Sequence, residues 1–165
     1  MTNRRLIIDI HRRGGDDNDR TIEAHTRKVL GVLLSTRLLN SIRVTIKLRA
    51  GLPKGRRGDC AFRDFTKGST ARSKHYTIRL RRDLPLRQQL RTLTHELKHL
   101  EQMARGRLAV RTTYGVPGFF WRAPGQTGPA TKFPILPGVG CETPWHLQPW
   151  EIEAMETEER FHGPK

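Results

Sequence analysis

Hydrophobic residues recur every three or four positions in two long segments of the chain. In residues 84–105 this spacing is kept by five leucines, which would share one face of a helix. They are Leu86, Leu90, Leu93, Leu97 and Leu100. Residues 21–39 show the same periodicity. Both segments are therefore predicted to be amphipathic helices whose apolar faces pack on a core.

The ends of the 84–105 helix carry residues typical of helix termini. Asp83 is expected to be the N-cap, with Pro85 in the first turn. Gly106 is a suitable stop, and Arg105 places a cation where the helix dipole favours one. A last helix is predicted from Pro149 to about Phe161.

Shorter segments alternate apolar and polar residues, which indicates strands with one buried face. These segments are 42–49 (IRVTIKLR) and 75–82 (HYTIRLRR), with a further short strand at 4–11. Residues 59–65 are expected to form the second strand of a hairpin, after the basic loop 53–58. The order of elements predicts an α+β fold. In it, a small, mostly antiparallel sheet packs on the N-terminal helix and the 84–105 helix.

Residues 106–148 differ from the rest in composition. Seven of the fifteen glycines lie here, together with six of the aromatic residues. Those aromatic residues are Tyr114, Phe119, Phe120, Trp121, Phe133 and Trp145. We expect a long irregular insertion in a single domain that spans residues 1–165. Such loops are often functional. This one either covers a cleft or docks a partner, or it is an ordered surface excursion with its own small core.

Composition excludes several classes of protein. The chain has 165 residues and 35% hydrophobic content, without an apolar run long enough to span a membrane. No signal-peptide pattern is visible. Cys60 and Cys141 lie far apart and outside any CxxC motif, so neither a disulfide framework nor a cysteine zinc site is expected. The default expectation is an intracellular protein that is not bound to a membrane.

The net charge of +15 is unevenly distributed. Residues 142–165 contain six acids and only two cations, so the basic excess lies in residues 1–141. A charge of this size predicts an acidic partner, most often a nucleic acid. The alternative is that the cations only solvate the surface. No known DNA-binding motif accompanies them.

The sequence His95-Glu96-Leu97-Lys98-His99 is an HExxH motif. Histidines four apart lie one turn apart on the same face of a helix, where both imidazoles reach one metal ion. His95 and His99 are therefore predicted ligands of Zn²⁺, and Glu96 is the expected general base toward a zinc-bound water.

A catalytic zinc ion usually has a third protein ligand. The downstream donors are Cys141, His146, Glu151, Glu153, Glu156 and His162. Glu151 and Glu153 lie about 200° apart around a helix, so only one of them faces the metal. Glu153 precedes Ala154, a small residue that allows close helix packing. We therefore expect Glu153 to be the third ligand, with Glu151 as the alternative.

The combination HELKHLEQ and PWEIEA resembles the zincin metallopeptidases of the gluzincin type, and is similar to small metallopeptidase-like proteins of phages and bacteria. The resemblance covers residues 75–105 and 149–157. It implies that Glu153 is the ligand and that strand 75–82 borders the cleft and pairs with an extended substrate. The family often has an aspartate four residues after the ligand, where this chain has Thr157. SprT-like proteases are a second resemblance, and they use a third histidine, for which His162 is the candidate.

The expected function is zinc-dependent peptide hydrolysis, with Tyr114 and His146 as candidates for stabilising the oxyanion. The alternative is a basic structural or nucleic-acid-associated protein, such as a phage particle component, that keeps a zincin scaffold with or without catalysis. A protease linked to DNA would combine both. The sequence does not predict the oligomeric state.

Overall fold

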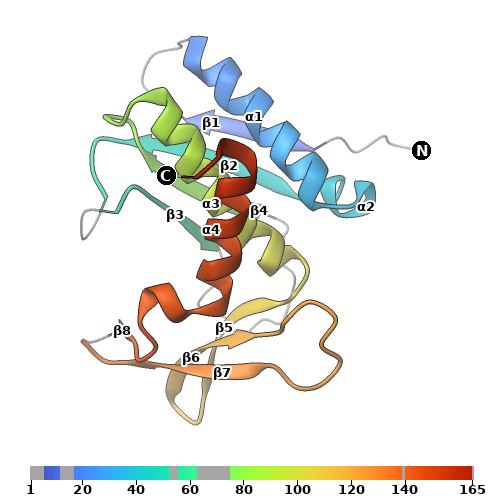
Figure 1. The fold of residues 1–165 in the computed structure, drawn as a ribbon, viewed down its shortest axis with the longest axis vertical. Coiled ribbons are helices and arrows are strands. Elements are labelled where there is room, and N and C mark those ends of the chain that lie inside the picture. The colour runs from blue at the N-terminus through green and yellow to red at the C-terminus, as the bar shows by residue number, and fades with distance from the viewer. Residues whose placement is uncertain (1–5, 12–16, 53–55, 63–74, 139, 165) are drawn as a thin grey trace.

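The computed structural model describes residues 6–11, 17–52, 56–62, 75–138 and 140–164. The described chain forms a mixed α+β structure with two small sheets (Figure 1), which confirms the predicted class. Its helices are α1 (Asp17–Leu33), α2 (Thr36–Leu39), α3 (Leu86–Ala104), η2 (Trp145–Leu147) and α4 (Pro149–His162). Its strands are β1 (Ile7–His11), β2 (Arg43–Arg49), β3 (Gly58–Phe62), β4 (His75–Arg81), β5 (Leu108–Thr113), β6 (Val116–Trp121), β7 (Thr131–Leu136) and β8 (Gly140–Cys141).

The first sheet has the strand order β1-β2-β4-β3. The prediction that it is mostly antiparallel was wrong, because β1 pairs with β2 and β2 pairs with β4 in parallel. The predicted hairpin between 42–49 and 59–65 was also wrong. The strand β3 pairs with β4 instead, in antiparallel register, and residues 63–65 lie outside the described residues. Parallel pairing requires a long connection between β2 and β4, and residues 50–74 supply its length.

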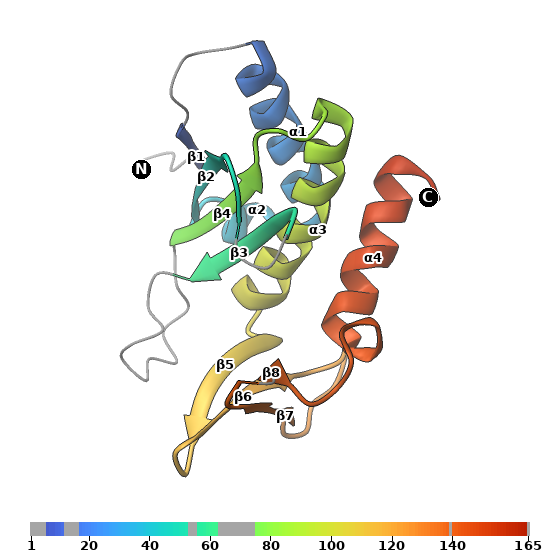
Figure 2. The same ribbon diagram turned by 90° about the vertical axis from the view of Figure 1, so that its left-hand side faces the viewer.

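Apolar side chains of β2 and β4 pack against α1 and α3 to form the core. Ile46 and Ile78 lie on neighbouring strands and are fully buried. The leucine stripe of α3 packs here as predicted, with Leu93, Leu97 and Leu100 fully buried and Leu86 and Leu90 partly buried. Figure 2 shows these helices on one side of the first sheet, with α4 packed on the outer side of α3.

The ends of α3 differ in how well the sequence predicted them. Gly106 has a φ of +70°, a conformation that suits glycine, and its N–H donates to Met103 O, while that of Arg107 donates to Gln102 O. These two bonds are those of a Schellman motif, which confirms the predicted stop. The N-cap is Pro85 and not Asp83. Asp83 instead pairs with Arg81, because the turn between β4 and α3 brings the two side chains together.

The predicted irregular insertion is a second sheet. Its strands β5, β6, β7 and β8 are joined in sequence order by antiparallel pairing. The glycines serve its turns and close approaches: Gly115 has a φ of +78°, and a Cβ at Gly118 would lie 3.1 Å from Phe133 O. The many glycines and prolines of this segment therefore reflect turns between short strands. They do not indicate a loop without secondary structure.

None of the described helices has the length and apolar character needed to cross a membrane. Cys60 and Cys141 are both free.

Candidate metal centre

The middle of α3 presents His95 and His99 side by side. The i, i+4 spacing puts both imidazoles on the helix face that α4 covers, away from the leucine stripe. Their rings are 4.8 Å apart between centroids and nearly perpendicular. Both side chains are largely buried, at 12% and 11% exposure. Buried imidazoles need polar partners, and these come mainly from α4.

Glu151, in the first turn of α4, completes the group. Its Oε2 lies 3.0 Å from His95 Nε2, and its Oε1 lies 3.4 Å from His99 Nε2. The two Nε2 atoms are 3.2 Å apart. One donor atom from each residue lies within 4.8 Å of the other two, so this buried group could hold a metal ion. We call His95, His99 and Glu151 the HExxH cluster.

The structure brings Glu151 to the histidines in place of Glu153, which corrects the predicted ligand set. Glu153 lies on another flank of α4, where its carboxylate accepts a hydrogen bond from Arg107 and another, at 3.1 Å, from Gln102 Nε2. Lys98 Nζ is 3.4 Å from the same carboxylate. Glu153 is therefore part of an ion-pair network at the C-terminal end of α3.

The rotation of α4 about its axis explains this choice. Trp150 is 2% exposed and is surrounded by aromatic rings of the second sheet, with centroids of Phe119 and Phe133 each 5.0 Å away. Ala154 is fully buried. Glu151 is three residues before Ala154, about 60° around the helix, whereas Glu153 is about 100° away on the other side. Ala154 does allow close packing, as expected. The glutamate that this packing brings to the histidines is Glu151, one turn before Ala154, and not Glu153.

Gln102 holds His99 in the tautomer that a metal ligand needs. The side-chain N–H groups of Gln102 donate to Trp150 O at 2.9 Å and to the Glu153 carboxylate, so its Oε1 is left to accept. That oxygen lies 3.0 Å from His99 Nδ1, which must therefore carry the proton. The lone pair of His99 is then on Nε2, the atom that faces His95 and Glu151. Glu153 thus supports the cluster through Gln102.

Glu158 has the corresponding position beside His95. Its Oε2 lies 3.6 Å from His95 Nδ1, and its other oxygen accepts a hydrogen bond from Arg91 at 2.5 Å. Carboxylates behind ligating histidines typically orient the ring and increase its basicity. The family resemblance places such a group four residues after the ligand, where this chain has Thr157. Glu158 is seven residues, or two full turns, after Glu151, so both side chains lie on the same face of α4. This spacing is the feature of the sequence that could have identified Glu158 as a partner of His95.

The electrostatics of the cluster favour a positive charge at its centre. Burial alone would lower the pKa of His95, but the neighbouring carboxylates of Glu151 and Glu158 raise it to about 9. The pKa of His99 is raised in the same way, against burial, by Glu151 and Glu96. Burial opposes ionisation of Glu151, yet bonds to both histidines lower its pKa to about 2. A metal cation would satisfy the same attraction that retains a proton here.

Glu96 lies beside the cluster and is 7% exposed. Burial raises its pKa above the ordinary value, although the charges of His99 and His95 act in the opposite direction. The carboxylate also interacts electrostatically with Asp59 and Cys60 of β3. Glu96 is therefore located between the histidines and the edge strand of the first sheet, where a buried carboxylate with a raised pKa suits proton transfer.

The expected position of the substrate strand needs correction. Strand 75–82 was predicted to border the cleft, but β4 is an inner strand, with β2 on one side and β3 on the other. Its backbone groups are engaged in both ladders. Among the described strands of the first sheet, β3 is the edge that lies against α3 near Glu96.

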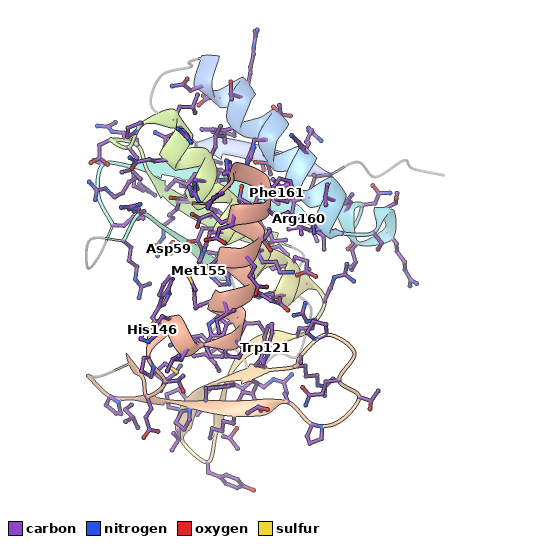
Figure 3. The ribbon with its side chains drawn as sticks, in the orientation of Figure 1. Asp59, Trp121, His146, Met155, Arg160 and Phe161 are labelled. Atoms are coloured by element: carbon purple, nitrogen blue, oxygen red, sulfur yellow. The ribbon has the colours of Figure 1, made fainter. Side chains whose placement is uncertain are left out.

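The two oxyanion candidates have different positions. Tyr114 is fully exposed at the tip of the β5–β6 hairpin and is not brought to the cluster. His146 lies in η2, exposed, on the turn that leads into α4 (Figure 3). Its neighbour Trp145 stacks on His95, with ring centroids 6.1 Å apart. Residues 145–147 therefore border the cluster, and Trp145 is a contact that sequence reasoning did not identify.

The remaining donors have other surroundings. Cys141 is in β8, and Glu156 is exposed on α4. His162 lies with His25, and the Nε2 of each ring is 2.8 Å from Thr94 Oγ1. The Thr94 hydroxyl donates to Leu90 O, so both imidazoles donate to its oxygen. We call His25, Thr94 and His162 the Thr94 cluster.

Comparisons of the chain with models of protein families, with curated proteins and with solved structures gave no match. The functional argument therefore rests on the residues and on the geometry of the HExxH cluster.

Proposed function

We propose that this chain is a zinc-dependent peptidase whose metal ligands are His95, His99 and Glu151. The observation that carries the proposal is the convergence of both Nε2 atoms and the Glu151 carboxylate, directly beside Glu96. Two imidazoles and one carboxylate form a common ligand set of catalytic zinc, which leaves a fourth position for water. Mg²⁺ and Ca²⁺ prefer sites made of oxygen ligands, so this donor set favours zinc.

Each residue has a defined part in hydrolysis. When bound, zinc lowers the pKa of a water molecule toward neutrality and polarises the scissile carbonyl group. Glu96 accepts the proton of the attacking water and delivers it to the leaving amine. Gln102 and Glu158 keep the two histidines oriented toward the metal. Trp145 shields one face of the His95 ring from solvent.

The edge strand β3 offers a way to position the substrate. Among the described strands it is an edge of the first sheet and lies against α3, and an extended peptide that paired with this edge would lie beside the helix that carries Glu96. This role replaces the one expected for strand 75–82. The side chain of His146, on the opposite border, is the remaining candidate for contact with the scissile carbonyl group.

The test is a comparison of the wild type with Glu96→Gln. The amide preserves the size of the side chain but cannot accept the proton, so cleavage of a casein or mixed-peptide substrate should fall by roughly 10²–10⁴-fold. Zinc content, measured by elemental analysis, should stay at the wild-type value. Glu156→Gln, an exposed position on α4, is the matched control and should cleave normally.

Two results would contradict the proposal. If Glu96→Gln still cleaved at the wild-type rate, Glu96 would not be the base. If the wild type bound zinc without cleaving any peptide, the alternative of a basic structural protein with a metal-bound scaffold would be favoured.

A further inference from the structure

The side of the first sheet that faces away from the helices carries a concentration of cations. Successive residues of a strand point to opposite sides. Val44, Ile46, Ile78 and Leu80 point to the helices and are buried. The opposite side, to which no described helix or strand is packed (Figure 2), is what we call the cationic sheet face. Its cations are Arg43, Lys47, Arg49, Arg79 and Arg81.

The register of the strands places like charges directly opposite one another. Lys47 pairs with Arg79, and Arg49 pairs with Arg81, as Cα partners in the parallel ladder. Neighbouring strands lie about 4.8 Å apart, and like charges at this separation destabilise a sheet. The stability of the sheet therefore does not explain why cations occupy these positions.

Acidic residues neutralise only part of the cationic sheet face. Asp9 lies 3.3 Å from Arg43, Asp59 accepts hydrogen bonds from Arg79, and Asp83 pairs with Arg81. Within the described residues, Lys47 and Arg49 have no acid within ion-pairing distance. Arg49 is exposed and Lys47 is half-buried. These two cations are available to a ligand.

Further arginines extend this surface at the end of the strands. Arg56, Arg57 and Arg82 are exposed. The backbone fixes the positions of Arg57 and Arg82, because Arg82 N–H donates to Arg49 O and Arg81 N–H donates to Arg57 O. The cations thus form an array over β2, β4 and the start of β3. The acidic helix α4 lies on the other side of the molecule, beyond α3 (Figure 2). The basic surface and the acidic helix are therefore separated.

A nucleic-acid backbone is the polyanion that this array fits best. The cations are spaced along each strand by about 6.7 Å and across strands by about 4.8 Å, which suits a rigid chain of regularly spaced phosphates. An acidic peptide would contact one row. No aromatic residue occupies this side of β2 and β4, so bases have no stacking platform. We propose that the cationic sheet face binds the phosphate backbone of duplex nucleic acid without reading its sequence. This proposal does not depend on the metal centre.

The test uses the full chain and a fluorescently labelled 20-base-pair DNA duplex of mixed sequence. Anisotropy titrations at several salt concentrations give the slope of log affinity against log salt. Lys47→Gln with Arg49→Gln should weaken binding at low salt by about tenfold or more. It should also make the slope less steep by one to two, because each cation that contacts a phosphate contributes about one. Arg20→Gln with Lys28→Gln removes the same charge from α1, on the helical side, and should change the slope little.

The proposal fails if the two double variants lose affinity equally, because the effect would then be one of total charge. It also fails if the wild type does not bind the duplex, or if poly-glutamate competes as well as unlabelled DNA, since the partner would then be an acidic protein. Circular dichroism and thermal unfolding establish that both variants fold. If Lys47→Gln with Arg49→Gln unfolds, Arg49→Gln alone, at an exposed position, should still reduce the slope by about one.

Discussion

Two histidine pairs that meet at consecutive residues of α3 have opposite electrostatic properties: His95 and His99 belong to the helix itself, whereas His25 of α1 and His162 of α4 contact it at Thr94. In the HExxH cluster, carboxylates of α4 raise the pKa of His95 to about 9 against the effect of burial. In the Thr94 cluster, burial, followed by the nearby His162 and Lys28, lowers the pKa of His25 to about 4. Thr94 and His95 are consecutive residues, so the difference comes from the partners that other helices supply.

This comparison shows what distinguishes a buried histidine pair that could hold a cation from one that could not. In both clusters, two Nε2 atoms point to one place. In the Thr94 cluster that place is a neutral hydroxyl oxygen, which accepts protons from both rings. In the HExxH cluster it is bordered by the Glu151 carboxylate, which adds the negative charge that a cation needs. Substitutions in the two clusters test that contrast.

Replacement of Glu151 should have the largest effect on metal binding. Glu151→Gln removes the negative charge of the cluster but retains the size of the side chain. Zinc affinity, measured by competition with a chromogenic chelator, should fall by more than the roughly 10–100-fold that is typical of an outer partner. Glu153→Gln is the matched control two residues away and should reduce the affinity by less than tenfold. A larger loss for Glu153→Gln would return the third ligand to Glu153.

Glu158 should have an intermediate effect, because it acts through His95 and does not reach the metal. Glu158→Gln should reduce zinc affinity or peptidase activity by roughly 10–100-fold. The exposed Glu156→Gln should leave both unchanged. The variant also leaves Arg91 without its ion-pair partner, so urea unfolding is needed to separate lost stability from lost orientation. Normal zinc affinity in a destabilised Glu158→Gln would mean that the residue is only structural.

The Thr94 cluster should affect pH-dependent stability alone. The pKa of His25 is lower in the folded chain than the ordinary 6.5, so the folded state binds fewer protons than the unfolded state between pH 6.5 and 4. Its contribution to stability is present above pH 6.5 and is lost as the pH falls to 4. His25→Gln should reduce the loss between pH 7.5 and 5 by on the order of 1 kcal/mol, which allows for the solvent that reaches the ring.

Urea unfolding at the two pH values measures this difference, and His11→Gln, at an exposed position, is the control. The loss of Glu151 ionisation occurs below pH 4.5 and so lies outside this range. If the His25→Gln variant kept the full wild-type pH dependence, burial of His25 would not be its source. Zinc content should be unchanged in the variant, because among the described residues no carboxylate joins His25 and His162 in a group of possible metal donors.

Local sequence patterns determined the parts of this protein that depend on spacing along one element. The i, i+4 histidines of α3, its leucine stripe and its glycine stop follow from helical geometry alone, and the alternation in 42–49 and 75–82 follows from the pleat of a strand. These features were predicted correctly because each needs only its own segment. The aromatic and glycine content of 106–148 was visible, but its division into strands depends on pairing between distant residues.

Only the tertiary structure decided which glutamate joins the histidines. Glu151 and Glu153 are on the same helix with similar neighbours in sequence, and their roles depend on how α4 is rotated against α3. That rotation is set by Trp150, whose burial among rings of β6 and β7 requires the second sheet to be in place. Figure 3 shows Trp121 of that sheet beside the first turn of α4. Local geometry thus brings the two histidines of the HExxH motif together, while the packing of Trp150 in the second sheet decides which glutamate joins them.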